Sequence, residues 1–134
     1  MANIVLLHGA YQGGWIWTRV TACLRAAGHN VFAPTLDGCG ERRHALRPGI
    51  DTESQAAEVA ELLFFEDLKD VILVGTSCGG MIACRVAELA RDRIAHLFPG
   101  ALDAEQRGAA RRAPPMGPLP GSAELAPDAQ VAAP

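Results

Sequence analysis

The chain has 134 residues, of which 49% are hydrophobic and 20% are charged, and its formal net charge is −3. These values describe an ordinary globular chain with room for one domain and one hydrophobic core. A weakly acidic chain without a polybasic segment lacks the electrostatic footprint of a protein that binds nucleic acid or an anionic membrane surface.

The sequence also bears on the compartment and on metal binding. No apolar stretch approaches the length of a membrane-spanning helix, and the first residues lack the basic segment of a signal peptide. We therefore expect a cytoplasmic protein. Its cysteines have no CxxC spacing, so the sequence predicts reduced thiols, no metal site and no cofactor. These cysteines are Cys23, Cys39, Cys78 and Cys84.

The first half of the chain alternates strand and helix patterns. Residues 3–7 are a short β-branched and leucine-rich run, which predicts a buried strand. Apolar residues then recur at helical spacing over residues 15–27, and Gly28 is typical of the position just past a helix C-terminus. A second strand is expected at residues 31–34, and a loop rich in Gly, Pro and Arg occupies residues 35–50.

The alternation continues in the second half. Thr52 and Gln55 predict a capping box for a second helix, which ends near residue 65. Residues 70–75, DVILVG, form the clearest strand, and their continuous apolar character indicates burial on both faces of a parallel sheet. A third helix and a fourth strand are expected at residues 79–90 and 93–98.

Strands that alternate with helices predict an α/β fold, a parallel sheet with helices on both faces. Right-handed crossovers favour the spatial order second, first, third, fourth strand. The first and third strands are then neighbours at a topological switch point. Ligands bind at such a point, outside the carboxyl ends of the strands.

The composition changes abruptly at Pro99. Residues 99–134 are rich in Ala, Pro, Gly and Arg and contain no Ile, Phe, Trp or Tyr. Such a segment buries too little apolar surface to offset the entropy lost on ordering. We therefore expect one α/β domain over residues 1–98 and a disordered low-complexity tail over residues 99–134.

One motif predicts a catalytic nucleophile. Residues 75–79, GTSCG, fit the pattern G-x-S-x-G of a nucleophile elbow, and Gly80 adds further room. The elbow places a serine on a sharp strand-to-helix turn, where Gly75 and Gly79 avoid clashes. A chance match occurs in roughly a few per cent of chains of this length. A strong strand before the motif and a helix after it favour the elbow, with Ser77 as the nucleophile.

An oxyanion hole requires backbone donors aimed at the tetrahedral intermediate. The N–H of Cys78, which follows the nucleophile at a helix N-terminus, supplies one donor. The second donor is expected in the loop after the neighbouring strand, which begins at His8 and Gly9. We therefore predict the N–H of Ala10 as the second donor.

Three segments resemble one branch of a known family. Residues 8–17, HGAYQGGWIW, resemble the "HGAxxGGWxW" opening of the plant methylesterase and hydroxynitrile lyase branch of the α/β-hydrolases and of its bacterial esterase relatives. Residues 26–31 resemble the "AAGHxV" step of this branch, and residues 71–81 resemble "VILVGHSxGGM". The resemblance implies a partial α/β-hydrolase fold, Ser77 as nucleophile and Ala10 with Cys78 as oxyanion donors.

The chain departs from this family at two places. Thr76 stands where the family usually has histidine, a change that affects packing beside the serine. Nothing after Phe98 resembles the family segments that carry the catalytic acid and base. We therefore expect a chain that is truncated after its fourth strand, with a tail that looks like a shifted reading frame or a degenerated end.

His8 and His96 are candidates for the catalytic base, and Asp103 and Asp128 are candidates for the acid. His8 precedes the nucleophile and is expected to hold its loop by hydrogen bonds, while His96 falls within a strand. Asp103 and Asp128 lie in the low-complexity tail. The remaining candidates have structural interpretations: His29 and His44 as loop residues, Trp15 and Trp17 as helix packing, Cys78 as a backbone donor, and residues 41–43 as a solvated loop.

Taken together, the sequence predicts a serine hydrolase that acts on a small-molecule carboxylic ester through an acyl-enzyme at Ser77. We expect weak or no activity, because neither acid nor base is identifiable. A hydroxynitrile lyase on the same fold is one alternative. A non-catalytic protein that binds a small molecule in the pocket between the first and third strands is the other. Neither nucleic acid nor a membrane is expected as a partner.

Overall fold

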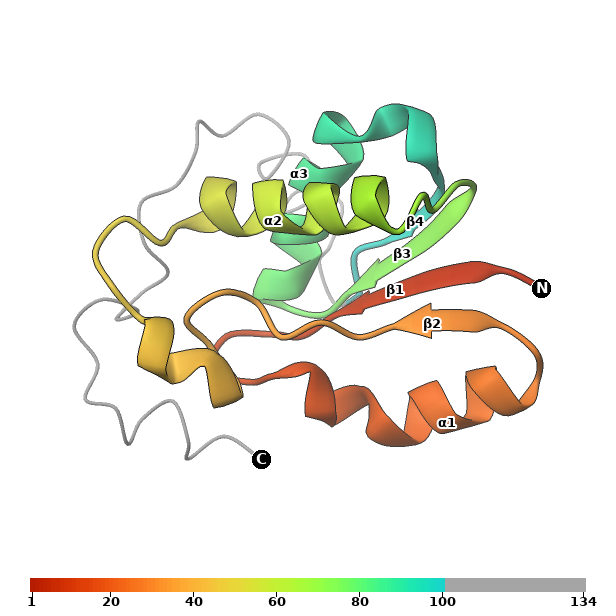
Figure 1. Ribbon diagram of the computed structural model, residues 1–134, viewed down its shortest axis with the longest axis horizontal. Helices are drawn as coiled ribbons and strands as arrows, with labels where there is room; N and C mark the ends of the chain where they lie inside the picture. Colours follow the sequence, from red (N-terminus) through yellow and green to blue (C-terminus); the bar gives the residue numbers. More distant parts are fainter. Residues whose placement is uncertain (101–134) are drawn as a thin grey trace.

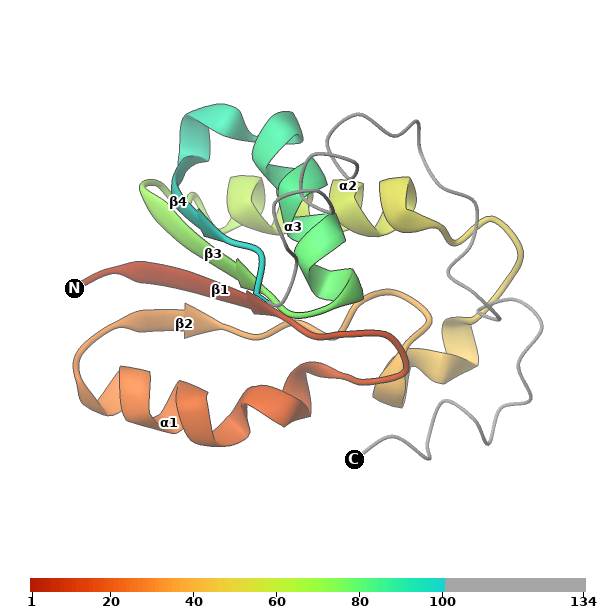
Figure 2. The same ribbon diagram turned by 180° about the vertical axis from the view of Figure 1, so that it is seen from behind.

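A computed structural model describes residues 1–100 as a four-stranded parallel sheet with helices on both faces (Figures 1 and 2). The sheet order is β2-β1-β3-β4, with β1 paired to both β2 and β3. The expected strand order is confirmed, and so is the adjacency of the first and third strands. The strands are β1 (Asn3–Leu7), β2 (Asn30–Phe32), β3 (Val71–Gly75) and β4 (Ile94–Phe98).

Two layers of apolar side chains lie on opposite faces of the sheet, because successive strand residues point to opposite sides. On one face, α1 (Thr18–Ala26) packs over β1 and β2, with Ile4, Leu6 and Val31 buried. On the other face, α2 (Thr52–Phe65) and α3 (Cys78–Leu89) cover a larger core. That core includes Val5, Leu7, Val59, Leu63, Leu73, Ile82 and Val86.

The first helical segment differs from the expected single helix over residues 15–27. It begins as a 3-10 turn, Gly14–Trp17, and becomes α-helical only at Thr18. Its end matches the expectation at Gly28, which has a φ of 92°. The Gly28 N–H donates to the Arg25 carbonyl at 2.9 Å, and the His29 N–H donates to the Leu24 carbonyl at 3.1 Å. This pair of bonds is a Schellman motif, which satisfies the last carbonyls of the helix.

The predicted capping box at Thr52 and Gln55 is wrong by one residue. The N-cap is Asp51, whose carboxylate accepts the Ser54 N–H at 2.7 Å, while the Ser54 hydroxyl accepts the Asp51 N–H at 2.9 Å. Aspartate is as good an N-cap as threonine, and a shifted D-x-x-S pattern also fits the sequence. The Gln55 side chain is instead buried, and its amide donates to the Asp37 carbonyl at 3.0 Å.

The loop between β2 and α2 is more ordered than the sequence indicates. It contains a 3-10 helix, Gly40–Ala45, and a buried carboxylate on Asp37. Arg47 pairs with Asp37 at 2.9 Å, and Arg42 contacts both Asp37 and Glu58. Residues 41–43 are therefore not simply a solvated loop, because the Arg42 guanidinium ties this loop to α2.

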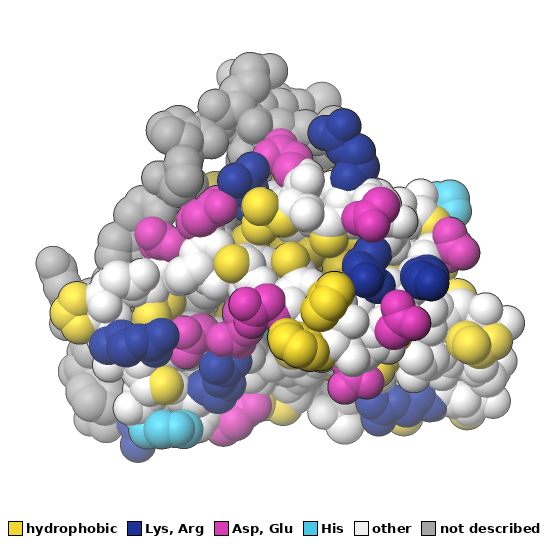
Figure 3. Space-filling model, turned by 45° about the horizontal axis from the view of Figure 1, so that its top comes forward, with side chains coloured by type: hydrophobic (Ala, Val, Ile, Leu, Met, Phe, Trp, Pro, Cys, Tyr) yellow, Lys and Arg dark blue, Asp and Glu magenta, His cyan; other side chains and the backbone are white. Residues whose placement is uncertain are grey.

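Charged side chains of both signs are interspersed on the face shown in Figure 3, with apolar side chains between them. Some of these charges pair: Arg85 of α3 contacts Glu53 of α2 at 2.7 Å and Glu88 at 2.8 Å. Hydrogen bonding to Arg85 lowers the pKa of the Glu53 carboxyl. Among residues 1–100, no helix is both long and apolar enough to cross a membrane.

The expected disordered tail, residues 99–134, lies outside the described residues except for Pro99 and Gly100. The candidates Asp103 and Asp128 lie outside them too. Gly100 has a φ of 65° and returns the chain to the carboxyl end of β3, where a Cβ on it would stand 2.3 Å from the Gly75 carbonyl oxygen.

Candidate active site

The turn between β3 and α3 has the geometry of a nucleophile elbow. Ser77 has φ 52° and ψ −124°, a conformation that non-glycine residues rarely adopt. A Cβ on Gly75 would stand 2.3 Å from the Gly79 carbonyl oxygen, and one on Gly79 would stand 2.2 Å from the His8 carbonyl oxygen. Only glycine fits at both positions, so the spacing of the motif follows from how closely α3 approaches β1 and β3.

Ser77 is exposed at the first turn of α3. The Gly79 N–H donates to the Thr76 carbonyl at 2.9 Å, and the Gly80 N–H donates to the Ser77 carbonyl at 2.8 Å. The N–H of Cys78 makes no hydrogen bond within residues 1–100, as expected for the first residue of a helix. A donor that is unsatisfied beside an exposed hydroxyl suits an anion that forms there.

His8 is completely buried, and both of its ring nitrogens are engaged. Its Nε2 accepts the Leu36 N–H at 2.8 Å, so Nδ1 carries the proton and donates to the Gly9 carbonyl at 2.7 Å. Burial lowers the pKa of the His8 imidazole, which favours this neutral form. His8 therefore links the loop after β1 to the loop after β2.

The loop after β1 passes directly beside the elbow. A Cβ on Gly9 would stand 3.4 Å from the Cβ of Ser77. The Gln12 N–H donates to the Gly9 carbonyl at 3.4 Å, and the Gly9 N–H donates to the Gln12 side-chain oxygen at 2.9 Å. These bonds enclose Ala10 in a tight turn. The N–H of Ala10 itself makes no hydrogen bond to another of the described residues.

The two glycines that follow allow this loop to fold against β2. A Cβ on Gly14 would stand 2.0 Å from the Ala33 carbonyl oxygen, and the Gly14 N–H donates to the Thr35 hydroxyl at 2.9 Å. Trp17 packs against the core under α1. Trp15 is 39% exposed, so its indole contributes less to helix packing than the sequence indicates.

The three other histidines, His29, His44 and His96, are not placed to act as a base for Ser77. His96 is exposed in the middle of β4, paired with Ile72. Ile72 lies three residues before Gly75, the last residue of β3, so His96 is about 10 Å short of the elbow along the strand direction. The His29 ring accepts the Ala2 N–H at 3.1 Å at the opposite end of β1, and His44 is exposed in the 3-10 helix.

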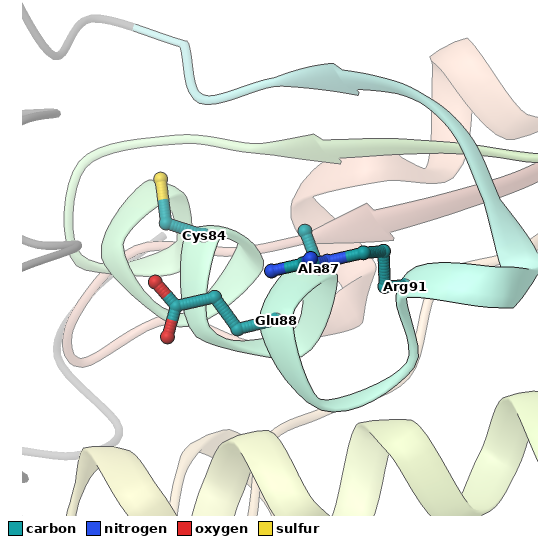
Figure 4. A pocket seen from close by; sticks show the side chains of 4 residues that line it. All are labelled: Cys84, Ala87, Glu88 and Arg91. Atoms are coloured by element: carbon teal, nitrogen blue, oxygen red, sulfur yellow. The ribbon is translucent and has the colours of Figure 1, made fainter.

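Neither the buried cysteines nor the cavity beside α3 adds a catalytic or metal-binding group near Ser77 in the described region. Burial raises the pKa of the Cys39 thiol to about 11, so this sulfur stays protonated at neutral pH. A cavity of about 390 Å³ is lined by Cys84, Ala87, Glu88 and Arg91 (Figure 4). Even its nearest lining residue, Cys84, lies about 10 Å along α3 from Ser77. Within residues 1–100, no cluster of three or more His, Cys, Asp or Glu side chains is placed to hold a metal ion.

Sequence reasoning missed two features of this region. One is Gln12, which holds the Gly9 N–H. The other is the buried Asp37 with its arginine partners. A glutamine within a loop has no local signature, since its role depends on how the chain turns. The carboxylate and guanidinium residues at 37, 42 and 47 were visible in the sequence, but nothing in it showed that one carboxylate would be buried.

The strained serine, the close glycines and the adjoining turn after β1 have the geometry expected of a nucleophile elbow on a parallel α/β sheet. A model of the alpha/beta hydrolase family matches residues 4–133, and the chain belongs to this family. The match extends past Phe98, where the resemblance of individual motifs ends.

Individual relatives include both esterases and a lyase. The chain is 46% identical over 95 residues to a carbendazim hydrolyzing esterase from Nocardioides sp. (strain SG-4G), covering 71% of this chain and 38% of the relative. It is 32% identical over 88 residues to an alpha-hydroxynitrile lyase from Arabidopsis thaliana, covering 65% of this chain and 34% of the relative. An extracellular α/β-hydrolase from a Paenibacillus species superposes with a TM-score of 0.64 at 31% identity, covering 70% and 38% of the two chains. The chain thus spans less than two fifths of the length of these relatives.

Proposed function

We propose that this chain carries the nucleophile and oxyanion part of a serine hydrolase that acts on small-molecule carboxylic esters. The observation that carries the proposal is the conformation of Ser77, with φ 52° and ψ −124°, beside the turn at Gly9. A backbone held in so rare a conformation is typical of functional sites. Relatives such as the carbendazim hydrolyzing esterase support ester hydrolysis as the reaction class.

In this mechanism the Ser77 hydroxyl oxygen attacks the ester carbonyl carbon, and the carbonyl oxygen becomes an anion. The N–H groups of Ala10 and Cys78 donate to that oxygen. The bond to the alcohol then breaks, the alcohol leaves with the proton from Ser77, and an acyl-enzyme remains. Water hydrolyses the acyl-enzyme, which releases the acid and restores the hydroxyl.

The described residues do not supply a base for this serine. Both nitrogens of His8 are engaged, and His96 lies short of the elbow. No histidine follows His96 in the sequence. A serine hydroxyl is a weak nucleophile without an adjacent base. We therefore propose that the chain by itself hydrolyses esters only through the residual effect of its oxyanion donors and of substrate binding.

Because the described residues supply no base for Ser77, a second candidate is a non-catalytic protein that binds small molecules at the switch point between β1 and β3. In that case the elbow serves as a binding turn, and Ser77 donates or accepts a hydrogen bond. No feature of the described residues favours the hydroxynitrile lyase reaction, named for the Arabidopsis relative, over ester hydrolysis.

The proposal is tested by p-nitrophenyl acetate hydrolysis with three proteins: the chain, its Ser77→Ala variant, and a chimera that continues into the C-terminal part of the Nocardioides esterase. We expect a rate slightly above background for the chain, a lower rate for Ser77→Ala, and a rate several orders of magnitude higher for the chimera.

Three outcomes would redirect the assignment. Robust turnover by the chain alone would mean that His8 or His96 acts as a base after all. Equal rates for the chain and Ser77→Ala, with undiminished binding of 4-nitroacetophenone to both, would favour the binding protein. Cleavage of acetone cyanohydrin without ester hydrolysis by the chimera would favour the lyase.

A further inference from the structure

The side chain of Gln12 folds back over the turn that follows β1. Its oxygen accepts the Gly9 N–H at 2.9 Å, and its backbone N–H donates to the Gly9 carbonyl at 3.4 Å. An N–H donor requires an acceptor opposite it, so the amide is oriented with its oxygen towards Gly9. Two bonds between the same two residues enclose Ala10 and Tyr11.

The enclosed turn is conformationally demanding. Tyr11 has a φ of 61°, in the left-handed region that side chains other than glycine disfavour. Such a residue keeps its conformation only where the surroundings over-determine it. The backbone bond of 3.4 Å is long for a hydrogen bond, whereas the side-chain bond of 2.9 Å has ordinary length. The amide of Gln12 therefore makes the stronger of the two bonds between Gln12 and Gly9, while the His8 Nδ1–H holds the Gly9 carbonyl at 2.7 Å.

The same amide lies at the site of the proposed chemistry. A Cβ built on Gly9 would stand 2.9 Å from the Gln12 side-chain oxygen and 3.4 Å from the Cβ of Ser77. The Gln12 amide, the Gly9 backbone and the Ser77 side chain thus converge within one small volume. Ala10, whose N–H is the proposed second oxyanion donor, follows Gly9 directly.

We propose that Gln12 is a positioning residue, which fixes the direction of the Ala10 N–H by holding the Gly9 N–H. The inference rests on the proposed function, because a fixed direction matters only if that N–H stabilises an oxyanion at Ser77. Oxyanion donors act through preorganisation, so a donor that swings freely loses most of its effect. The role requires only an acceptor at the end of a side chain of this length. Glutamate supplies that acceptor, and leucine of similar size does not.

The test measures the residual p-nitrophenyl acetate hydrolysis of the chain, of Gln12→Leu and of Gln12→Glu, with Ser77→Ala as the reference for lost chemistry. Removal of a whole oxyanion donor lowers kcat by about 10²–10³-fold. We expect Gln12→Leu to lower the Ser77-dependent part of kcat, taken as the excess over the Ser77→Ala rate, by about tenfold with KM unchanged, since the donor remains but is less well directed. Gln12→Glu should retain more of this rate than Gln12→Leu, because its carboxylate also accepts the Gly9 N–H, but less than the unaltered chain, because its negative charge opposes the nearby oxyanion.

A second readout is independent of turnover. Amide hydrogen exchange at Gly9, followed by NMR, should accelerate in Gln12→Leu and stay slow in Gln12→Glu, while the core amides of β1 keep their protection in both variants.

The outcomes separate this inference from the proposed function. Equal rates for the chain and Ser77→Ala would overturn the proposed function, and the positioning role with it. A Ser77-dependent rate that Gln12→Leu leaves unchanged would overturn the positioning role alone. A rise in KM at constant kcat would also overturn it, because Gln12 would then bind substrate. Unaltered Gly9 exchange in Gln12→Leu would show that the side chain does not hold the turn.

Discussion

At the scale of single residues, His8 shows how a polar side chain becomes part of a core. It is fully buried, yet neither of its nitrogens is unsatisfied, because the Leu36 N–H and the Gly9 carbonyl meet them. A buried polar group with its hydrogen bonds made avoids most of the desolvation penalty. Protonation of Nε2 would place a donor opposite the Leu36 donor and break this arrangement.

This arrangement predicts a pH dependence of stability. Burial lowers the pKa of His8 in the folded chain below its ordinary value of about 6.5, which the unfolded chain retains. The unfolded chain therefore binds the additional proton first as pH falls. The contribution of His8 to stability is complete above about pH 6.5 and declines below it, at no more than about 1.4 kcal/mol per pH unit.

Urea denaturation at pH 8, 7, 6 and 5.5 measures this decline. The His8→Asn variant should be less stable at every pH but should lack the part of the decline that belongs to His8. An identical decline in the two proteins between pH 7 and 5.5 would contradict the assignment.

At the scale of elements, the start of α2 depends on a cap that the sequence pattern places one residue too late. Asp51 has an extended backbone, with φ −143°, and makes the reciprocal bonds with Ser54. Thr52 is already the first helical residue, and its buried hydroxyl has no hydrogen-bond partner among the described residues. The negative charge of Asp51 also interacts favourably with the positive end of the helix dipole.

We predict opposite consequences at these neighbouring positions. Asp51→Ala should lower the free energy of unfolding by about 1 kcal/mol, because it leaves the Ser54 N–H without its acceptor. Thr52→Val, which replaces an unsatisfied buried hydroxyl by a methyl group, should leave stability within about 0.5 kcal/mol or raise it. Chemical denaturation of both variants checks the pair. A larger loss of stability for Thr52→Val than for Asp51→Ala would support Thr52 as the N-cap, as predicted from the sequence.

At the scale of the whole molecule, the sheet is covered unevenly. α2 and α3 cover one face, whereas α1 packs over β1 and β2 on the other. β4 is the outermost strand on its side of the described sheet, and Phe98 at its end is 55% exposed. An edge strand with exposed apolar side chains is a template for pairing with another chain.

We therefore predict that Phe98→Lys raises the protein concentration at which aggregation begins, since charge on an edge strand opposes intermolecular pairing. Static light scattering against concentration measures the onset. Phe65→Lys is the matched control, because Phe65 is 78% exposed but belongs to α2 rather than to a strand. If both variants shift the onset equally, exposed apolar surface rather than the strand edge controls aggregation.

Much of the fold followed from patterns along the chain. The apolar runs at β1 and β3 and the βαβ alternation determined the parallel sheet and its strand order. The spacing of Gly75, Ser77 and Gly79 determined where the sharp turn would fall. These features are local or follow from handedness, so they are encoded in short segments. The break between the 3-10 turn and α1 was not visible, because helical spacing of apolar residues does not distinguish the two helix types.

Only the tertiary structure decided the interactions between loops that are distant in sequence. The tautomer of His8 depends on the Leu36 N–H, 28 residues away, and the ion pairs of Arg42 depend on a carboxylate of α2, Glu58, 16 residues away. The amide of Gln12 acquires its partner only when the chain turns back on itself. Polar side chains have several possible partners in a sequence, and packing selects one of them by excluding water from the rest. The sequence therefore located the elbow, whereas the folded loops decided what surrounds it.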